Sequence, residues 1–294
     1  MPRYKTDRPF TEDQLSAMDV IHDSDTTMFH DQCEESYVVE DFIDDLECIK
    51  IAHFFQKNFD SIGHNINDHV YHITHPMAIP EISEIMKDKI YDHFGSDVVF
   101  YSDVSNDPMS VGDQLFKSTR PYGLHTDAVT HINGYRPYKD IIVPVELDGI
   151  DETQYVTFNQ RYRGRATHFM RGRKKGSFAN YANVIRHQSY EEYGVEGIDY
   201  SEKDHAILEK LMPEHIPMSI YEGLTIEKVL PWRPKCAIIH DASVLHAPAD
   251  YREHGCQYKI GLTLHLMKAD PTYNNRLEGY YTPFSRYTKP LIKA

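Results

Sequence analysis

The chain has 294 residues, with 31 Lys and Arg against 45 Asp and Glu, so its formal net charge at neutral pH is -14. This balance argues against nucleic acid or an anionic membrane as a partner of the surface as a whole. Hydrophobic residues make up 40% and aromatic residues 12%, which excludes a disordered chain and allows a large packed core. No apolar run is long enough to span a membrane, and none follows the first residues as in a signal peptide. The four scattered cysteines have no paired spacing, which favours reduced thiols in a cytoplasmic protein.

Two helices are predicted in the first third of the chain. Residues 38–43 predict a strand or turn that leads into a helix from about Asp44 to Asn58, with acidic residues at its start, where the helix dipole favours them. Its residues at helical spacing are Leu46, Ile49, Ala52, His53 and Gln56. The second helix is predicted to begin at Pro80 and to end at Gly95, with a stripe of Ile82, Ile85, Met86, Ile90 and Phe94. We therefore expect residues 1–96 to form a helical lead-in.

From residue 97 the pattern changes to short β-rich runs separated by Gly, Pro, Asn and Asp, which is typical of antiparallel sandwiches and barrels. The runs are 98–101, 124–129, 141–145, 155–158, 237–240 and 258–266. An insertion over about 151–230 interrupts them with polar sequence, in which a helix is predicted from Ser201 to about Met212. Nothing resembles a linker, so we expect one domain over residues 1–294, with a β core over 97–270 and a tail over 271–294.

Two segments carry residues suited to metal chemistry. His125 and Asp127 are two apart in a predicted strand, so their side chains project to the same side. Such a triplet is common by chance in a chain with 18 histidines, but His246 and the strand after it add to the signal. In that strand Lys259 shares a face with Gly261, Thr263 and His265, as in a barrel interior that admits an anion. Two imidazoles and one carboxylate form the facial triad of non-haem Fe(II) oxygenases.

The spacing of these residues resembles the 2-oxoglutarate/Fe(II)-dependent oxygenase superfamily. The resemblance covers about residues 36–270 and depends on His125-x-Asp127, on His246 121 residues after His125, and on a basic residue 13 beyond His246. Residues 231–239 resemble its strand before the distal histidine, and residues 246–266 are similar to the ending of bacterial and phage members. The helix around 42–55 resembles the lead-in helix of the phytanoyl-CoA-hydroxylase-like and prolyl-hydroxylase-like branches. The resemblance implies a mainly β fold with flanking helices, a double-stranded β-helix of the jelly-roll or cupin-like kind.

The resemblance also implies a set of cofactors and an activity. Fe(II) would be bound by His125, Asp127 and His246, with 2-oxoglutarate as cosubstrate, dioxygen as oxidant and ascorbate as a candidate reductant. Lys259 would pair with the 5-carboxylate of 2-oxoglutarate; the candidate helper hydroxyls are Thr263 and Tyr101. Related halogenases have a small residue at the carboxylate position, so Asp127 favours hydroxylation or desaturation. The expected reaction is hydroxylation of a small polar metabolite with release of succinate and carbon dioxide.

Two other functions stay open at this point: hydroxylation of a residue in a protein, and a non-catalytic β-barrel that binds a metal or an anion. Candidate substrate contacts are His131 and basic residues of the segment 161–175, namely Arg161, Arg163 and Arg171, although a solvated loop is the ordinary explanation of such a charge run.

Several further residues need an assignment. His240 competes with His246 as the distal ligand, although the order of strand, Asp241, turn and His246 matches the family better. A structural or surface role is expected for His64, His69, His72 and His75, whose spacing fits no metal motif. The aromatic residues after Met267 predict a tail that packs across the barrel or forms a homodimer contact.

Overall fold

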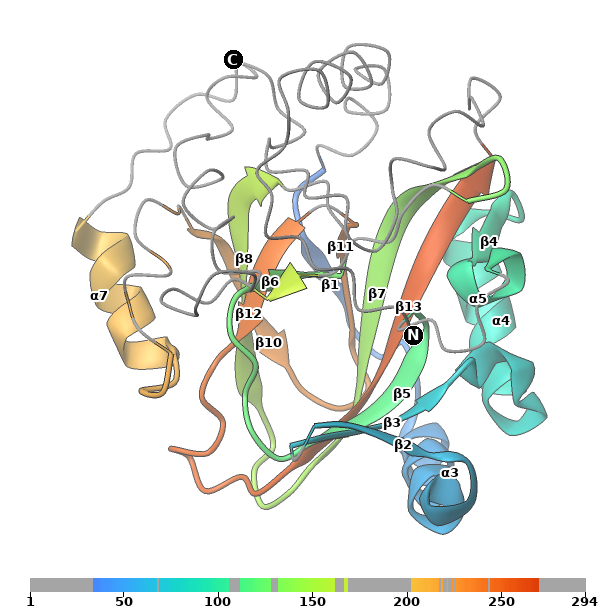
Figure 1. Ribbon diagram of the computed structural model, residues 1–294, viewed down its shortest axis with the longest axis horizontal. Helices are drawn as coiled ribbons and strands as arrows, with labels where there is room; N and C mark the ends of the chain where they lie inside the picture. The colour runs from blue at the N-terminus through green and yellow to red at the C-terminus, as the bar shows by residue number, and fades with distance from the viewer. Residues whose placement is uncertain are drawn as a thin grey trace, which may run out of the picture.

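Two antiparallel sheets face each other in the computed structural model, with helices on their outer sides (Figure 1). The structure describes residues 34–67, 69–105, 112–127, 132–161, 167–168, 202–216, 218, 221, 224, 226–242 and 244–269. The larger sheet has eight strands in the order β1-β11-β7-β13-β5-β3-β2, with β4 also paired to β13. The smaller sheet has five strands in the order β10-β8-β12-β6-β9. The expectation of a mainly β fold with flanking helices is confirmed for the described residues.

The strands of the larger sheet are β1 (Tyr37–Val39), β2 (His64–Asn67), β3 (Val70–Thr74), β4 (Val98–Phe100), β5 (Gln114–Ser118), β7 (Tyr135–Leu147), β11 (Ala237–Asp241) and β13 (Lys259–Ala269). Those of the smaller sheet are β6 (His125–Thr126), β8 (Thr153–Arg161), β9 (Thr167–His168), β10 (Ile226–Trp232) and β12 (Val244–Pro248). The helices are α3 (Asp45–Ile62), the 3-10 helix η1 (Pro76–Ala78), α4 (Pro80–Phe94), α5 (Tyr101–Val104) and α7 (Glu202–Leu211). No helix of the described residues has the length and apolar character needed to cross a membrane.

Strand β13 lies inside the larger sheet and separates two environments. Its apolar face packs into the core that the sheet shares with α3 and α4, through Ile260, Leu262, Leu264 and Leu266. Its other face looks toward the smaller sheet, because a Cβ added at Gly261 would lie 2.9 Å from Phe116 Cζ and 3.0 Å from Trp232 Cζ2. The predicted alternation is therefore confirmed, and the glycine is explained by the close approach of these two rings.

Helix α4 matches its prediction, whereas α3 turns a different side to the sheet. In α4, Ile82, Met86 and Ile90 are fully buried, as the stripe predicted. In α3 the expected stripe was wrong, because Leu46 and Ile49 are 57% and 63% exposed. The buried side consists of Cys48, Ile51, Ala52 and Phe55. Both sets have helical spacing, and the side that includes Phe55 buries the larger side chains against the sheet.

A buried lysine joins the two central strands β7 and β11 to the residues just before β1. Lys139 Nζ lies 2.5 Å from Asp241 Oδ1 and 2.5 Å from Glu34 Oε2, and the Glu34 backbone N–H donates to Asp241 Oδ2 at 3.1 Å. Burial alone would lower the pKa of Lys139, but the charges of Asp241 and Glu34 outweigh burial and raise it.

We expect Asp241→Asn to lower the free energy of unfolding by about 3 kcal/mol. The substitution removes the buried carboxylate that compensates the charge of the Lys139 ammonium. Urea unfolding monitored by circular dichroism measures the change. The control is Lys228→Met, which removes the partly exposed ion pair with Glu35 and should cost under about 1 kcal/mol. Equal losses in the two variants would contradict this account of the buried pair.

Candidate metal centre

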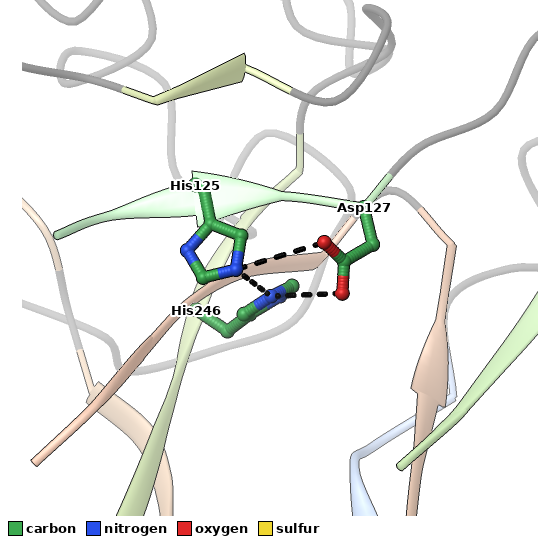
Figure 2. Close-up of side chains that lie close together, drawn as sticks. All are labelled: His125, Asp127 and His246. Atoms are coloured by element: carbon green, nitrogen blue, oxygen red, sulfur yellow. Dashed lines mark hydrogen bonds and ion pairs between the residues drawn. The ribbon is translucent and has the colours of Figure 1, made fainter. Parts of the chain in front are cut away.

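Three side chains with metal-ligand atoms meet on the inner side of the smaller sheet (Figure 2). His125 on β6 is the direct cross-strand partner of His246 on β12. Asp127 is the first residue after β6, two positions from His125, so its side chain lies on the same side. Antiparallel pairing of β6 with β12 thus brings together residues that are far apart in the sequence.

The spacing of the ligand atoms fits a single ion. His125 Nε2 lies 3.0 Å from His246 Nε2, and Asp127 Oδ1 and Oδ2 lie 3.6 Å from His125 Nε2 and 3.4 Å from His246 Nε2. Two ligands at right angles, each about 2.1 Å from one ion, lie about 3.0 Å apart. Within the described part of the chain, this is the only group of three or more such side chains whose ligand atoms lie within 4.8 Å of one another.

Both imidazole rings are fixed by the main chain in the tautomer that binds metal. His125 Nδ1 lies 2.8 Å from the Gly123 carbonyl oxygen, and His246 Nδ1 lies 3.0 Å from the Val244 carbonyl oxygen. A carbonyl oxygen only accepts, so each Nδ1 carries the proton and donates it. With each Nδ1 engaged in this way, the Nε2 atom of each ring is left for a metal ion, and the two Nε2 atoms lie 3.0 Å apart. Backbone-anchored histidines are the usual surroundings of a metal centre.

Asp127 supplies the negative charge of the group. Burial raises the pKa of its carboxyl group, but the neighbouring His246 and His125 outweigh burial and hold the pKa well below its ordinary value. Its side chain is 16% exposed and that of His246 is 0% exposed, so the carboxylate and the ring nitrogens interact with little solvent between them. Two imidazoles and one carboxylate occupy three coordination positions and leave the others of a six-coordinate ion open.

His240 packs on the ring of His246 from the larger sheet. The two ring centroids are 4.8 Å apart, and Tyr155 stacks on both histidines, with its ring centroid 5.1 Å from that of His246. His240 Nδ1 donates to the Asp241 carbonyl oxygen at 3.0 Å, so its Nε2 accepts from the Tyr155 hydroxyl at 2.9 Å. Both nitrogens of this competing candidate are therefore engaged in hydrogen bonds away from the three ligand atoms.

Lys259 is a buried ammonium without a carboxylate partner among the described residues. It is 5% exposed, and its Nζ lies over the rings of Trp232 and Tyr251, 4.5 Å and 5.4 Å from their centroids. Burial lowers its pKa from 10.5 to about 7. Because an uncompensated buried charge is costly, such a lysine is typical of a site that receives an anion.

The other predicted contacts are only partly described. Thr263 is buried on the inner face of β13, four positions beyond Lys259, and Tyr101 is buried with its ring edge-on to His265 at 6.5 Å. Arg161 ends β8 opposite Val244, but its side chain lies outside the described residues. The remaining substrate candidates and the aromatic tail also lie outside them, namely His131, Arg163, Arg171 and residues 270–294.

The second histidine-rich stretch lies at the far edge of the larger sheet. His64 on β2 pairs with His72 on β3, and their ring centroids are 6.3 Å apart. His69 follows in the turn between these strands, and His75 is the residue directly before η1, with a φ of 53°. Among the described residues, these histidines form no group of three ligands.

Two charged residues on the inner face of the larger sheet were not singled out from the sequence. Asp140 on β7 is the cross-strand partner of His265 on β13 and of His240 on β11. His265 Nδ1 lies 2.7 Å from Asp140 Oδ1, and both residues are at most 1% exposed. The alternation of β13 already placed His265 on the same face as Lys259, and that was the available signal.

Neither a family model nor a curated protein matches this chain in sequence. Solved structures align over most of the chain at low identity. The carbocyclase SnoK from nogalamycin biosynthesis, described as non-heme and α-ketoglutarate dependent, is 10% identical, with 92% of each chain covered and a TM-score of 0.45. The epimerase SnoN, solved with Fe3+ and α-ketoglutarate, is 11% identical over 94% of this chain and 96% of its own, with a TM-score of 0.40. HygX from Streptomyces hygroscopicus, solved with nickel and 2-oxoglutarate, is 10% identical over 88% and 87%, with a TM-score of 0.38. Likenesses this distant assign no activity, so an assignment depends on the residues of the centre itself.

Proposed function

We propose that the protein is a 2-oxoglutarate- and Fe(II)-dependent dioxygenase that hydroxylates a small polar metabolite. The observation that carries the proposal is the convergence of His125 Nε2, His246 Nε2 and the Asp127 carboxylate within 3.0–3.6 Å. Two histidines and one carboxylate with open positions are the ligand set of non-haem Fe(II) oxygenases. Two facing antiparallel sheets with the centre between them agree with the double-stranded β-helix that the sequence resembles.

Each residue of the centre has a defined task in this proposal. His125, Asp127 and His246 hold Fe(II), which with 2-oxoglutarate and dioxygen supplies the oxidising chemistry that places one oxygen atom on the substrate and one in succinate. Lys259 binds the 5-carboxylate of the cosubstrate, and the rings of Trp232 and Tyr251 exclude water from that contact. A lysine offers a point charge rather than the planar fork of arginine.

Other parts of the site orient these groups or contact the substrate. Tyr155 and His240 keep the His246 ring from rotating. Thr263 is the candidate helper hydroxyl on the same inner face as Lys259. The net charge of -14 favours a small molecule over nucleic acid, and basic residues of the segment 161–175 are proposed to contact it.

Turnover of 2-oxoglutarate without a substrate tests the proposal. Protein incubated with Fe(II), ascorbate and 2-oxoglutarate is expected to form succinate slowly, and His125→Ala and Asp127→Ala should each reduce the rate at least about a hundredfold by removing a metal ligand. The control is His254→Ala, an exposed histidine in the turn before β13, which should leave the rate unchanged. Normal metal binding with no succinate under any substrate pool would instead indicate a non-catalytic metal-binding protein.

A further inference from the structure

The open side of the metal centre faces a row of three side chains on the larger sheet. All three ligand residues belong to β6 and β12 or directly follow β6, so the coordination positions that they leave open point away from the smaller sheet. Opposite them, His240, Asp140 and His265 are cross-strand neighbours on β11, β7 and β13. The row lies level with the centre, because the His240 ring packs on the ring of His246 at 4.8 Å.

His265 is held in one orientation within this row. Its Nδ1 donates to Asp140 Oδ1 at 2.7 Å, and its backbone N–H donates to the buried Asp113 Oδ1 at 2.6 Å. The Tyr101 ring meets it edge-on at 6.5 Å. The second ring nitrogen, Nε2, points away from Asp140, and no described residue forms a hydrogen bond or ion pair with it. The protein has thus fixed a buried imidazole and left one of its donors for another molecule.

We propose that His265 donates its Nε2–H to the metal-chelating carboxylate of the bound 2-oxo acid, at the end of the cosubstrate opposite to Lys259. This inference rests on the proposed function and assigns a second anion contact to the same site. His265 lies close enough to Asp127 for the charges of the two side chains to interact, although they come from different sheets.

The charge of the row suits a carboxylate. Burial lowers the pKa of His265, but the hydrogen-bonded Asp140 together with Asp127 and Asp113 outweighs burial and raises it to about 9, so both ring nitrogens carry protons at neutral pH. A divalent ion with the single negative charge of Asp127 leaves the loaded centre at +1, which also attracts an anion. A buried N–H without an acceptor is costly, and a carboxylate oxygen at Nε2 removes that cost through a charge-assisted hydrogen bond.

Calorimetric titration of the Mn(II)-loaded protein tests this assignment without requiring turnover. The two ligands are 2-oxoglutarate and 2-oxopentanoate, which keeps the 2-oxo acid end but has a methyl group in place of the second carboxylate. His265→Leu, which removes the donor but keeps an apolar side chain of similar volume, is expected to weaken both ligands by a similar factor, about ten- to a hundredfold. Lys259→Met is expected to weaken 2-oxoglutarate only. Asp140→Asn, which keeps an acceptor for Nδ1 but removes the charge, should show a smaller loss for both ligands.

The control is His72→Leu, the same change at another buried histidine of the same sheet, which should leave both dissociation constants unchanged. Mn(II) affinity and thermal melting are measured for every variant, so that a lost ion or a lost fold is recognised. Unchanged binding of 2-oxopentanoate in His265→Leu overturns the role of His265, whatever Asp140→Asn shows, and leaves the proposed function intact. If the wild-type protein binds Mn(II) but neither 2-oxo acid, the proposed function fails as well.

Discussion

Replacing His246 by alanine is expected to abolish the stabilisation of the protein by Fe(II) or Mn(II). The wild-type protein at an ion concentration of 100 times the dissociation constant should gain about 2.7 kcal/mol of unfolding free energy. His246→Ala and His125→Ala each remove one of three ligands, so we expect the affinity to fall by more than a hundredfold and that gain to disappear. Differential scanning calorimetry with and without a chelator measures the difference, and the exposed His254→Ala should retain the full gain.

The same measurement separates His246 from its neighbour in the stack. His240→Gln removes a ring that packs on His246 but no ligand atom, so metal affinity should fall by about tenfold at most. The opposite pattern, with a metal effect retained in His246→Ala and lost in His240→Gln, would make His240 the distal ligand. The ligand-free His246→Ala protein should itself lose about 2–4 kcal/mol of stability, because a fully buried ring that packs on Tyr155 and His240 is removed, so the metal effect is read within each variant as the difference with and without chelator.

Local patterns in the sequence predicted the elements on which the centre depends. The alternating pattern of β13 predicted that Lys259 and His265 lie on the face opposite to the core leucines. The prediction works because successive side chains of a strand point to opposite faces even where both faces are buried. Lys235, in the turn between β10 and β11, has a φ of 77°, in the region that favours glycine, and no local pattern in the sequence predicted this. Helix α4 was predicted with its boundaries because Pro80 and Gly95 mark its two ends.

Helix packing, strand register and the pairing of short strands could not be predicted from the sequence alone. Two apolar stripes compete on α3, and only packing against the sheet selects the side that includes Phe55. The contact of Asp140 with His265 depends on the register between β7 and β13, which a single sequence does not specify. The pairing of His125 with His246 likewise depends on two short strands. It was predicted because the spacing of these residues resembles a known family, and the strand patterns themselves do not specify it.

Lys259→Met is expected to stabilise the ligand-free protein and to weaken 2-oxoglutarate binding. Methionine fills a similar volume against Trp232 and Tyr251 without a charge to desolvate, so the unfolding free energy at pH 7 should rise by a few kcal/mol, on the order of 3. Loss of a charge-assisted contact to the 5-carboxylate should raise the dissociation constant about ten- to a hundredfold. Urea unfolding of chelator-treated protein and calorimetry of the metal-loaded protein give the two values. A variant that is destabilised and binds normally would remove Lys259 from the site.

The pH dependence of both quantities follows from the lowered pKa of Lys259. Between its pKa of about 7 in the native state and 10.5 in the unfolded state, the unfolded chain binds more protons, so the stability of the wild-type protein rises with pH over this range. The advantage of Lys259→Met should therefore be largest below pH 7 and should vanish as the pH approaches 10.5. Ligand binding has the opposite slope, because a dicarboxylate needs the ammonium and must take up a proton above pH 7. The affinity of the wild-type protein for 2-oxoglutarate should then fall by up to about tenfold per pH unit above 7. The affinity of Lys259→Met should not show this fall, because the titrating ammonium is gone.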